Sequence, residues 1–148
     1  MSTTTLFPDD KYELFDQLCH QQFPHDALIF LREHGNRASL EYLWYEGFLQ
    51  ATLGWDEEAL MSLERYKRSE PDGDLLGVTS GLLADIHHNA GNLYDASEEI
   101  KLALELLPDD PDILRKAQEI FDDIDDTFKG IILAILIAGL LSKPISKT

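Results

Sequence analysis

The sequence has little cysteine and little positive charge. Cys19 is the only cysteine among 148 residues, so the chain cannot close a disulfide within itself. Its first residues show no charged and then apolar leader, and these two features predict a cytoplasmic protein in a reducing compartment. Twelve basic residues against 28 acidic ones give a net charge of -16. Because so acidic a surface repels phosphate, we expect no nucleic-acid partner.

The sequence also lacks the motifs of common catalytic and cofactor sites. It contains no nucleophile elbow, phosphate-binding loop, dinucleotide fingerprint or paired zinc motif. Cys19, His20 and His25 have no obvious fourth metal ligand nearby, and the acidic run 122–126 lacks the ligand spacing and glycine of a calcium loop. We therefore expect no metal, no cofactor and no enzymatic activity. An enzyme that uses the thiol or a histidine is the alternative.

Charge is distributed unevenly along the chain. Residues 1–127 contain all 28 acidic residues and nine basic ones, a balance of -19. Residues 128–148 contain three lysines and no acidic residue. We therefore predict an N-terminal arm over residues 1–9, an acidic helical domain over residues 10–127, and an apolar tail with lysine flanks over residues 128–148.

Five positions of the acidic domain recur after 37 residues. The set is Gly54, Ala59, Leu63, Tyr66 and Pro71, followed by Gly91, Ala96, Ile100, Ala103 and Pro108. Glycine ends a helix in a left-handed turn, alanine lets the next helix approach closely, and proline ends that helix. A less regular unit covers residues 11–36, with Phe15, Leu18, Ala27 and Leu31 facing inward. The pattern predicts helix–turn–helix repeats, two clear and one degenerate.

These residues resemble the tetratricopeptide repeat (TPR) family, whose helix–turn–helix units are 34 residues long. The family spacing of a small residue, a bulky residue and proline matches residues 59–71 and 96–108, whereas Trp44 and Gly47 stand one residue closer together than in the family pattern. The resemblance covers about residues 10–110 and implies an all-α stack. Asp110 and Pro111 then begin an amphipathic helix that we expect to cap this stack, followed by a short apolar tail helix.

The resemblance implies a non-enzymatic binding module, with a protein or peptide partner lying along the first helix of each unit. Candidate groove residues lie beside the apolar stripe of two such helices: Tyr42, Tyr45, Leu49, Thr52, Ser80, Ala84 and His87. Some members of the family hold a partner's carboxylate with lysine and arginine, which are absent from both of these stretches. We therefore expect a groove lined by apolar or aromatic side chains.

The tail contains an unbroken apolar run over residues 130–141. A helix over this run would be apolar on every side, so none of its faces suits contact with water. The candidate membrane or docking residues are Phe128, Ile131, Ile132, Leu133, Ile135, Leu136, Ile137, Leu140 and Leu141. A helix over residues 128–142 would be about 22 Å long, shorter than a hydrocarbon core of about 30 Å, although flanking lysines can snorkel. Two alternatives stay open. The tail associates with the cytoplasmic face of a membrane, or it is buried in protein, either folded back into the repeat groove or packed against a second copy.

The layout of repeats, acidic cap and short apolar tail is similar to that of the tail-anchored mitochondrial fission adaptors. Residues 10–127 alone resemble the acidic repeat chaperones of bacterial type III secretion, which shield apolar partners. The first resemblance implies an adaptor or scaffold at a membrane. The second implies a soluble chaperone.

Overall fold

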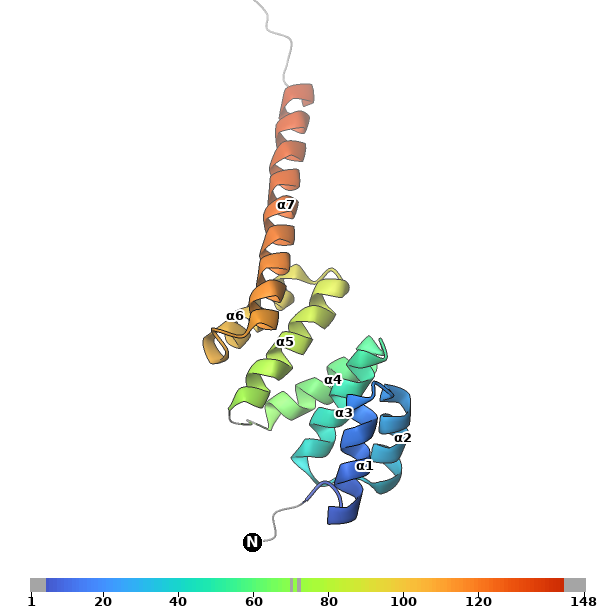
Figure 1. Cartoon of the computed structure of the whole chain (residues 1–148). Helices are drawn as coiled ribbons and strands as arrows, with labels where there is room; N and C mark the ends of the chain where they lie inside the picture. The colour runs from blue at the N-terminus through green and yellow to red at the C-terminus, as the bar shows by residue number, and fades with distance from the viewer. Residues whose placement is uncertain (1–4, 70, 72, 143–148) are drawn as a thin grey trace, which may run out of the picture.

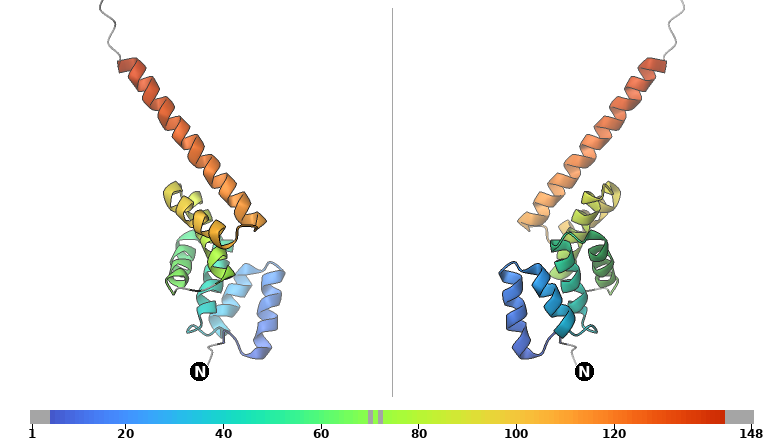
Figure 2. Two further views of the ribbon diagram at one scale, coloured as in Figure 1. Left: turned by 90° about the vertical axis from the view of Figure 1, so that its left-hand side faces the viewer. Right: turned by 90° about the vertical axis from the view of Figure 1, so that its right-hand side faces the viewer.

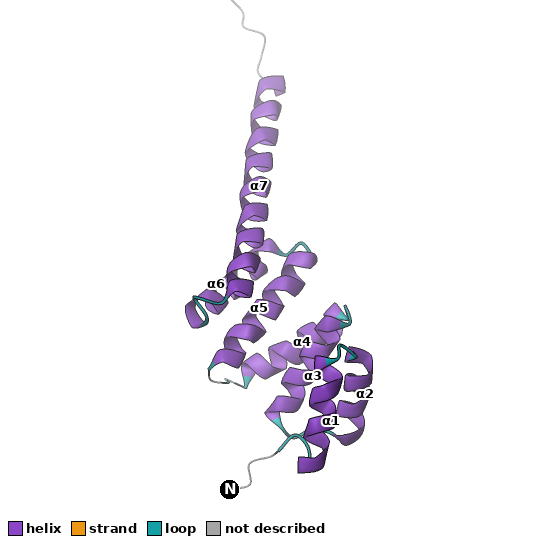
Figure 3. Cartoon of the chain, viewed as in Figure 1, coloured by secondary structure: helices purple, strands orange, loops and turns teal. Residues whose placement is uncertain are grey.

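The computed structural model describes residues 5–69, 71 and 73–142, and this part of the chain contains helices and no strand. The helices are α1 (Asp9–His20), α2 (Pro24–His34), α3 (Leu40–Thr52), α4 (Asp56–Arg68), α5 (Asp74–Asn89), α6 (Leu93–Leu106) and α7 (Pro111–Ser142). They form consecutive hairpins, and α7 extends from one end of the body (Figure 1). Figure 3 shows how short the connecting loops are. The prediction of an all-α fold is confirmed.

The turns inside the three hairpins share one backbone geometry. Each is closed by a backbone N–H that donates to the carbonyl five residues earlier: Phe23 to Leu18 at 3.0 Å, Trp55 to Gln50 at 2.9 Å, and Asn92 to His87 at 2.8 Å. The residue before each donor has a positive φ, which is 60° at Gln22, 78° at Gly54 and 81° at Gly91. The left-handed turns predicted for the two glycines are therefore confirmed, and the first hairpin has a glutamine at the same place.

The second helix of each hairpin brings a small residue to the centre of the packing. Ala27, Ala59 and Ala96 follow the left-handed residue by five positions and have no exposed surface. The bulky residues four positions later, Leu31, Leu63 and Ile100, are also fully buried. Side chains with the same spacing therefore occupy the same place in each hairpin, including the hairpin over residues 11–36.

Apolar side chains join the hairpins into one stack. Clusters of buried residues connect consecutive helices, represented by Phe15, Leu31 and Leu49 between α1, α2 and α3, by Leu63 and Leu83 between α4 and α5, and by Ala84, Ile100 and Ile113 between α5, α6 and α7. Removing this apolar surface from water is the main stabilising contribution. Each hairpin thus covers the apolar side of its neighbour.

The N-terminal segment is part of the folded body. Leu6 and Phe7 are each 1% exposed and lie in the cluster formed with α1, α2 and α3. The backbone N–H of Leu6 donates to the Tyr12 hydroxyl at 3.0 Å, and the carbonyl of Leu6 accepts from the N–H of Asn36 at 2.8 Å. The predicted arm over residues 1–9 is corrected here, because these two apolar side chains close the end of the first hairpin. Residues 1–4 lie outside the described part.

The first part of α7 caps the stack, and the remainder leaves it. Ile113, Ala117 and Ile120 are buried against α5 and α6. Beyond them the helix extends away from the body, as the two side views in Figure 2 show. The body therefore leaves the apolar part of α7 uncovered.

The predicted capping helix and tail helix are one uninterrupted helix. α7 contains no glycine or proline between Pro111 and Gly130, so nothing in the sequence ends the helix near Thr127. The ammonium of Lys129 lies 2.9 Å from the carboxylate of Asp125, one turn away, and this ion pair crosses the expected boundary. The change in composition at residue 128 is consequently not a change in backbone structure.

Gly91→Ala should lower the free energy of unfolding by about 1 kcal/mol, because alanine disfavours a left-handed backbone. The φ angle at Gly91 is 81°, and nothing lies within 4 Å of an added Cβ, so the loss measures the backbone alone. Urea unfolding followed by circular dichroism checks this. Gly130→Ala is the matched control, since it also has open space around the Cβ but lies within α7. An equal loss in both variants would contradict the assignment.

Candidate functional site

Two clefts meet at Phe48 of α3. One has a volume of about 380 Å³ and is lined by Cys19, Gln22, Pro24, Phe48, Leu49 and Thr52. The other has a volume of about 260 Å³, and its lining includes Phe48, Val78, Leu82, Asp112, Ile113 and Lys116. Phe48 lines both, and we call the two clefts together the Phe48 groove, with each cleft as one arm. It spans the first hairpin, α3, α5 and the start of α7.

Phe48 lies in the groove because the neighbouring side of α3 is packed tightly against α4. A Cβ on Gly47 would lie 2.7 Å from Cγ of Leu63, so glycine is needed for this approach. Trp44 and Phe48 are one turn apart, and their rings stack with centroids 5.2 Å apart and planes within 6°. The close contact at Gly47 therefore places an aromatic pair on the adjacent side of α3.

A further cleft continues the aromatic surface along α3. It has a volume of about 250 Å³ and is lined by Glu41, Trp44, Tyr45 and Leu75. Burial, and then the charge of Glu41, raise the pKa of Tyr45, so its hydroxyl stays protonated and able to donate. The indole N–H of Trp44 is buried and has no hydrogen-bond partner among the described residues. The strip thus combines apolar rings with the hydroxyl of Tyr45, while the indole N–H of Trp44 lies beneath the surface.

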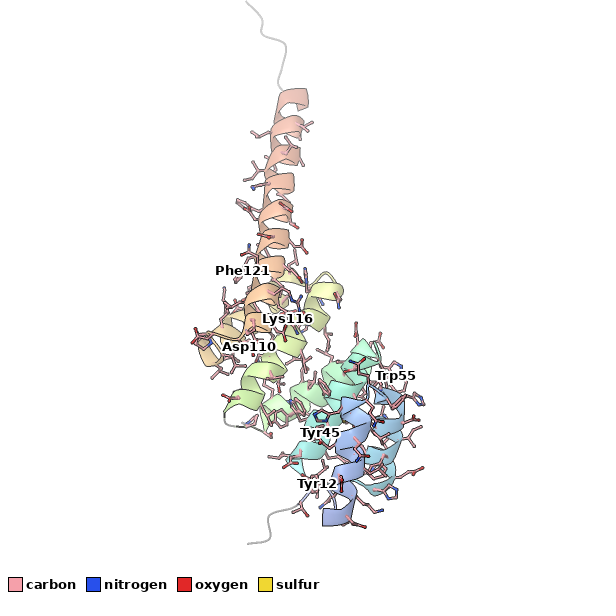
Figure 4. All side chains as sticks on the ribbon, viewed as in Figure 1. Tyr12, Tyr45, Trp55, Asp110, Lys116 and Phe121 are labelled. Atoms are coloured by element: carbon pink, nitrogen blue, oxygen red, sulfur yellow. The ribbon has the colours of Figure 1, made fainter. Side chains whose placement is uncertain are left out.

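Ion pairs hold α7 against α5 beside the groove. The ammonium of Lys116 lies 2.5 Å from the carboxylate of Asp85, and Nε2 of His88 lies 2.5 Å from the carboxylate of Asp123. At the start of α7, the carboxylate of Asp110 accepts backbone hydrogen bonds, one of them from Asp112 at 2.9 Å. Figure 4 shows Asp110 directly before α7, Lys116 on α7 and Tyr45 on α3. Asp85 neutralises the charge of Lys116. The carboxylates of Asp110 and Asp112 also line this cleft, so the edge of the groove is acidic overall.

The predicted groove residues fall into two groups, those that lie at a cleft or near the surface and those that lie in the core. Leu49 and Thr52 line one arm of the Phe48 groove, and Tyr45 lines the adjoining cleft. His87 is half-buried at the end of α5, where its carbonyl accepts the bond that closes the α5–α6 turn. Tyr45, Thr52 and His87 lie at or near the surface of the stack, whereas Leu49 is 1% exposed and belongs to the core cluster of α1, α2 and α3.

The other three predicted residues belong to the core. Tyr42 is 3% exposed, and Ser80 and Ala84 have no exposed surface. Tyr42 packs in the first cluster together with Leu49, and Ala84 packs against the helix that follows α5. Their assignment to a groove is corrected because these positions face neighbouring helices within the stack.

The residues that define the groove were not recognised from the sequence. Trp44 belongs to the tryptophan–glycine pair that was interpreted there as part of a repeat pattern, and Phe48 was not considered. Gly47 was the available signal, because a glycine inside a helix marks a close contact and places its neighbours beside that contact. Val78 and Lys116 come from α5 and α7, and no local spacing connects them to α3.

Cys19 contributes a thiol to one arm of the groove. Nδ1 of His20 lies 2.8 Å from the carbonyl of Asp16, and the ring of His25 packs edge-on to Trp55 with centroids 6.0 Å apart. Within residues 5–69, 71 and 73–142, no three His, Cys, Asp or Glu side chains gather as a metal site. Burial, and to a lesser degree the charge of Asp16, raise the pKa of Cys19.

The second half of α7 exposes apolar side chains on every side. The exposed fraction is between 42% and 64% for Phe128, Ile131, Ile132, Leu133, Ile135, Leu136 and Ile137. The side chains of Leu140 and Leu141, and residues 143–148, lie outside the described part. Among the described helices, none has the length and apolar character needed to cross a membrane.

A separate apolar cleft lies where α7 leaves the body. It has a volume of about 310 Å³ and is lined by Leu93, Tyr94, Ser97, Ile124, Thr127, Phe128 and Ile131. We call it the α6–α7 cleft. Comparisons with protein-family models, with curated proteins and with solved structures find no match to this chain. What the two concave surfaces offer a partner follows from their own residues.

Cys19 should react with iodoacetamide several-fold more slowly in the folded protein than in the urea-unfolded chain at about pH 8. Its raised pKa leaves less thiolate at that pH, and the side chain is half-buried. The rate should also rise at higher pH in the folded protein than in the unfolded chain. Because the chain has one cysteine, mass spectrometry measures this site alone. Equal rates would contradict the placement of the thiol.

Proposed function

We propose that the protein is a non-enzymatic protein–protein interaction module, a TPR-type adaptor or scaffold whose Phe48 groove holds an apolar segment of a partner protein. The observation that carries the proposal is the half-buried stack of Trp44 on Phe48, because Phe48 lines both clefts of the groove and Trp44 lines the adjoining one. Aromatic side chains in partly buried depressions contribute a large share of the binding energy at protein interfaces.

The TPR-type assignment is supported by the three hairpins. Their turns close with the same hydrogen bond, and a fully buried alanine follows each turn at the same distance. Repeats of this kind present the first helix of each unit to a ligand. The groove lies on that side of the stack, because its lining residues come largely from α1, α3, α5 and α7.

The chemistry of the groove favours an apolar segment that also carries lysine or arginine. Aliphatic side chains of α5 and α7 face the Phe48 ring across one arm, and they suit leucine, isoleucine or phenylalanine. The edge is acidic, and residues 1–127 carry a balance of -19, so basic residues of the partner would be attracted during approach. We expect the module to act in the cytoplasm, since its single thiol is suited to a reducing compartment.

Selection of random peptides on the immobilised full chain tests this proposal. Peptides of about twelve residues displayed on phage should be enriched in apolar residues together with lysine or arginine. Phe48→Ala should weaken binding of the selected peptides at least about tenfold, because it removes the ring shared by both arms. Calorimetry with the purified peptides measures this change.

Met61→Ala is the matched control for that experiment. Met61 is 67% exposed on α4 and lines none of the clefts of the groove described above, so binding should stay within about twofold of the unchanged chain. Circular dichroism verifies that both variants are folded. Enriched peptides that bind the Phe48 variant as tightly as the unchanged chain would refute the groove as the partner site.

A further inference from the structure

The cleft beside Trp44 is open to the surface and lies between α3 and the start of α5. It is the cleft of about 250 Å³ described above, and we call it the Trp44 cleft. Glu41 and Leu75 are exposed, and Trp44 and Tyr45 are half-buried, so all four side chains can contact a partner. Tyr45 marks the cleft in Figure 4. The packing of the stack thus leaves two aromatic rings and a carboxylate around one open space.

The two aromatic rings line the cleft at nearly a right angle. The ring centroids of Trp44 and Tyr45 are 5.0 Å apart, and their planes are inclined by 80°. Each ring is held in turn by a further ring, because Trp44 stacks on Phe48 and Tyr45 packs edge-on to Phe15 with centroids 5.0 Å apart. The rings are therefore fixed before a partner arrives, so little side-chain freedom is lost on binding.

The charges around the Trp44 cleft favour a cation. The face of an aromatic ring attracts positive charge, and the carboxylate of Glu41 adds a negative charge. Glu46, on the same helix, already pairs with Arg32, whereas Glu41 forms no ion pair with any residue that the structure describes. The indole N–H of Trp44, which could have bound an anion, lies beneath the surface. A positive charge is therefore what the cleft lacks.

The lining groups suit a guanidinium better than an ammonium. The carboxylate of Glu41 can accept two parallel N–H bonds from a guanidinium. Burial, and then the charge of Glu41, raise the pKa of Tyr45, so its ring stays uncharged and its hydroxyl oxygen can accept a further bond. A guanidinium is flat and more weakly hydrated than an ammonium, so it stacks on a ring and leaves water at lower cost. Leu75 offers apolar surface to the methylene groups of the same side chain.

We propose that the Trp44 cleft binds the guanidinium of an arginine in the partner segment, against the rings of Trp44 and Tyr45 and the carboxylate of Glu41. This inference deepens the function proposed above and rests on it for the partner segment. The affinity of the cleft for arginine is measured without that segment.

The position of the cleft sets the spacing between this arginine and the apolar part of the partner. Glu41, Trp44 and Phe48 follow one another at three and four positions, so they lie on one face of α3. Trp44 lies about 6 Å from Phe48 along the helix axis, which about two residues of an extended peptide span. Since the arginine side chain is long, we expect the arginine within about four residues of the side chain that contacts Phe48.

Nuclear magnetic resonance of the full chain tests the cleft with a single arginine. The chain has two tryptophans, Trp44 and Trp55, so its two indole N–H signals report on two places, and Trp55→Phe assigns them. Acetyl-arginine amide at millimolar concentrations should shift the Trp44 signal to a saturating value. It should leave the signal of Trp55 in place, because Trp55 lines none of the clefts described above. Acetyl-citrulline amide, which is similar in shape but uncharged, should shift neither signal.

Glu41→Gln and Glu57→Gln separate the cleft from the overall charge of the protein. Each variant removes one negative charge from an exposed side chain, so both should fold, but Glu57 is on α4 and lines none of these clefts. Glu41→Gln should weaken binding of acetyl-arginine amide at least about threefold, because the charged acceptor is lost. Glu57→Gln should leave it nearly unchanged, since salt screens a distant charge.

The peptides selected on the Phe48 groove test whether a partner uses the cleft. Replacing the arginine of a selected peptide by citrulline should weaken binding to the unchanged chain at least about fivefold. Replacing it by lysine should weaken binding at least about twofold. In Glu41→Gln the effect of citrulline should shrink to within about twofold, as expected for two groups in direct contact. Calorimetry measures each of these changes.

Failure of this inference and failure of the proposed function give different results. The arginine site is overturned if the Trp44 signal does not move, if both amides move it equally, or if Glu41→Gln and Glu57→Gln weaken binding equally. Selected peptides that lose affinity with Phe48→Ala, but not with citrulline, would overturn the site and keep the groove. A saturating Trp44 shift without any selected peptide would keep the site and refute the groove as the partner surface.

Discussion

The close contact between the two helices of each hairpin is the constraint on which the rest of the structure depends. It is made over alanine and glycine: Ala59 and Ala96 have no exposed surface, and Gly47 leaves no room for a Cβ beside Leu63. Because the contact side of α3 is filled in this way, the bulky rings of Trp44 and Phe48 lie beside it. The groove is therefore a consequence of how α3 and α4 pack.

The repeated turn supplies the second half of this arrangement. A residue with positive φ reverses the chain direction within a few residues. The second helix therefore packs antiparallel to the first, at a fixed position along its axis. Gln22 adopts this backbone without being glycine, which shows that packing of the first hairpin maintains the turn even where the residue itself disfavours it. Spacing and packing thus specify the same hairpin in three different sequences.

The sequence was informative wherever a local rule decides the structure. Gly54 and Gly91 marked their turns, and the buried alanines followed at the expected distance, because both depend on neighbours within a few positions. It was less informative about exposure: Tyr42, Ser80 and Ala84 appeared to lie off the apolar stripe but face adjacent hairpins. The groove joins α3 to residues of α5 and α7 that lie 30 or more positions later, and no periodicity within one helix reveals that contact.

The change in composition near Thr127 does not end the helix, for a related reason. Composition changes there from acidic to apolar, but helix continuity depends on backbone hydrogen bonds, which neither type of side chain interrupts. Leu6 and Phe7 show the converse, because a short segment before the first helix has enough apolar area to complete the core.

The unbroken course of α7 joins the wall of the Phe48 groove to the apolar tail in one helix. At about 1.5 Å per residue its 32 residues form a rod of about 48 Å. One end of the helix lines the Phe48 groove, where Lys116 forms an ion pair with Asp85. The other end carries the uncovered apolar surface. The packing of Ile113, Ala117 and Ile120 against α5 and α6 therefore sets the direction in which the apolar tail points, and the same residues that complete the core also aim the uncovered surface.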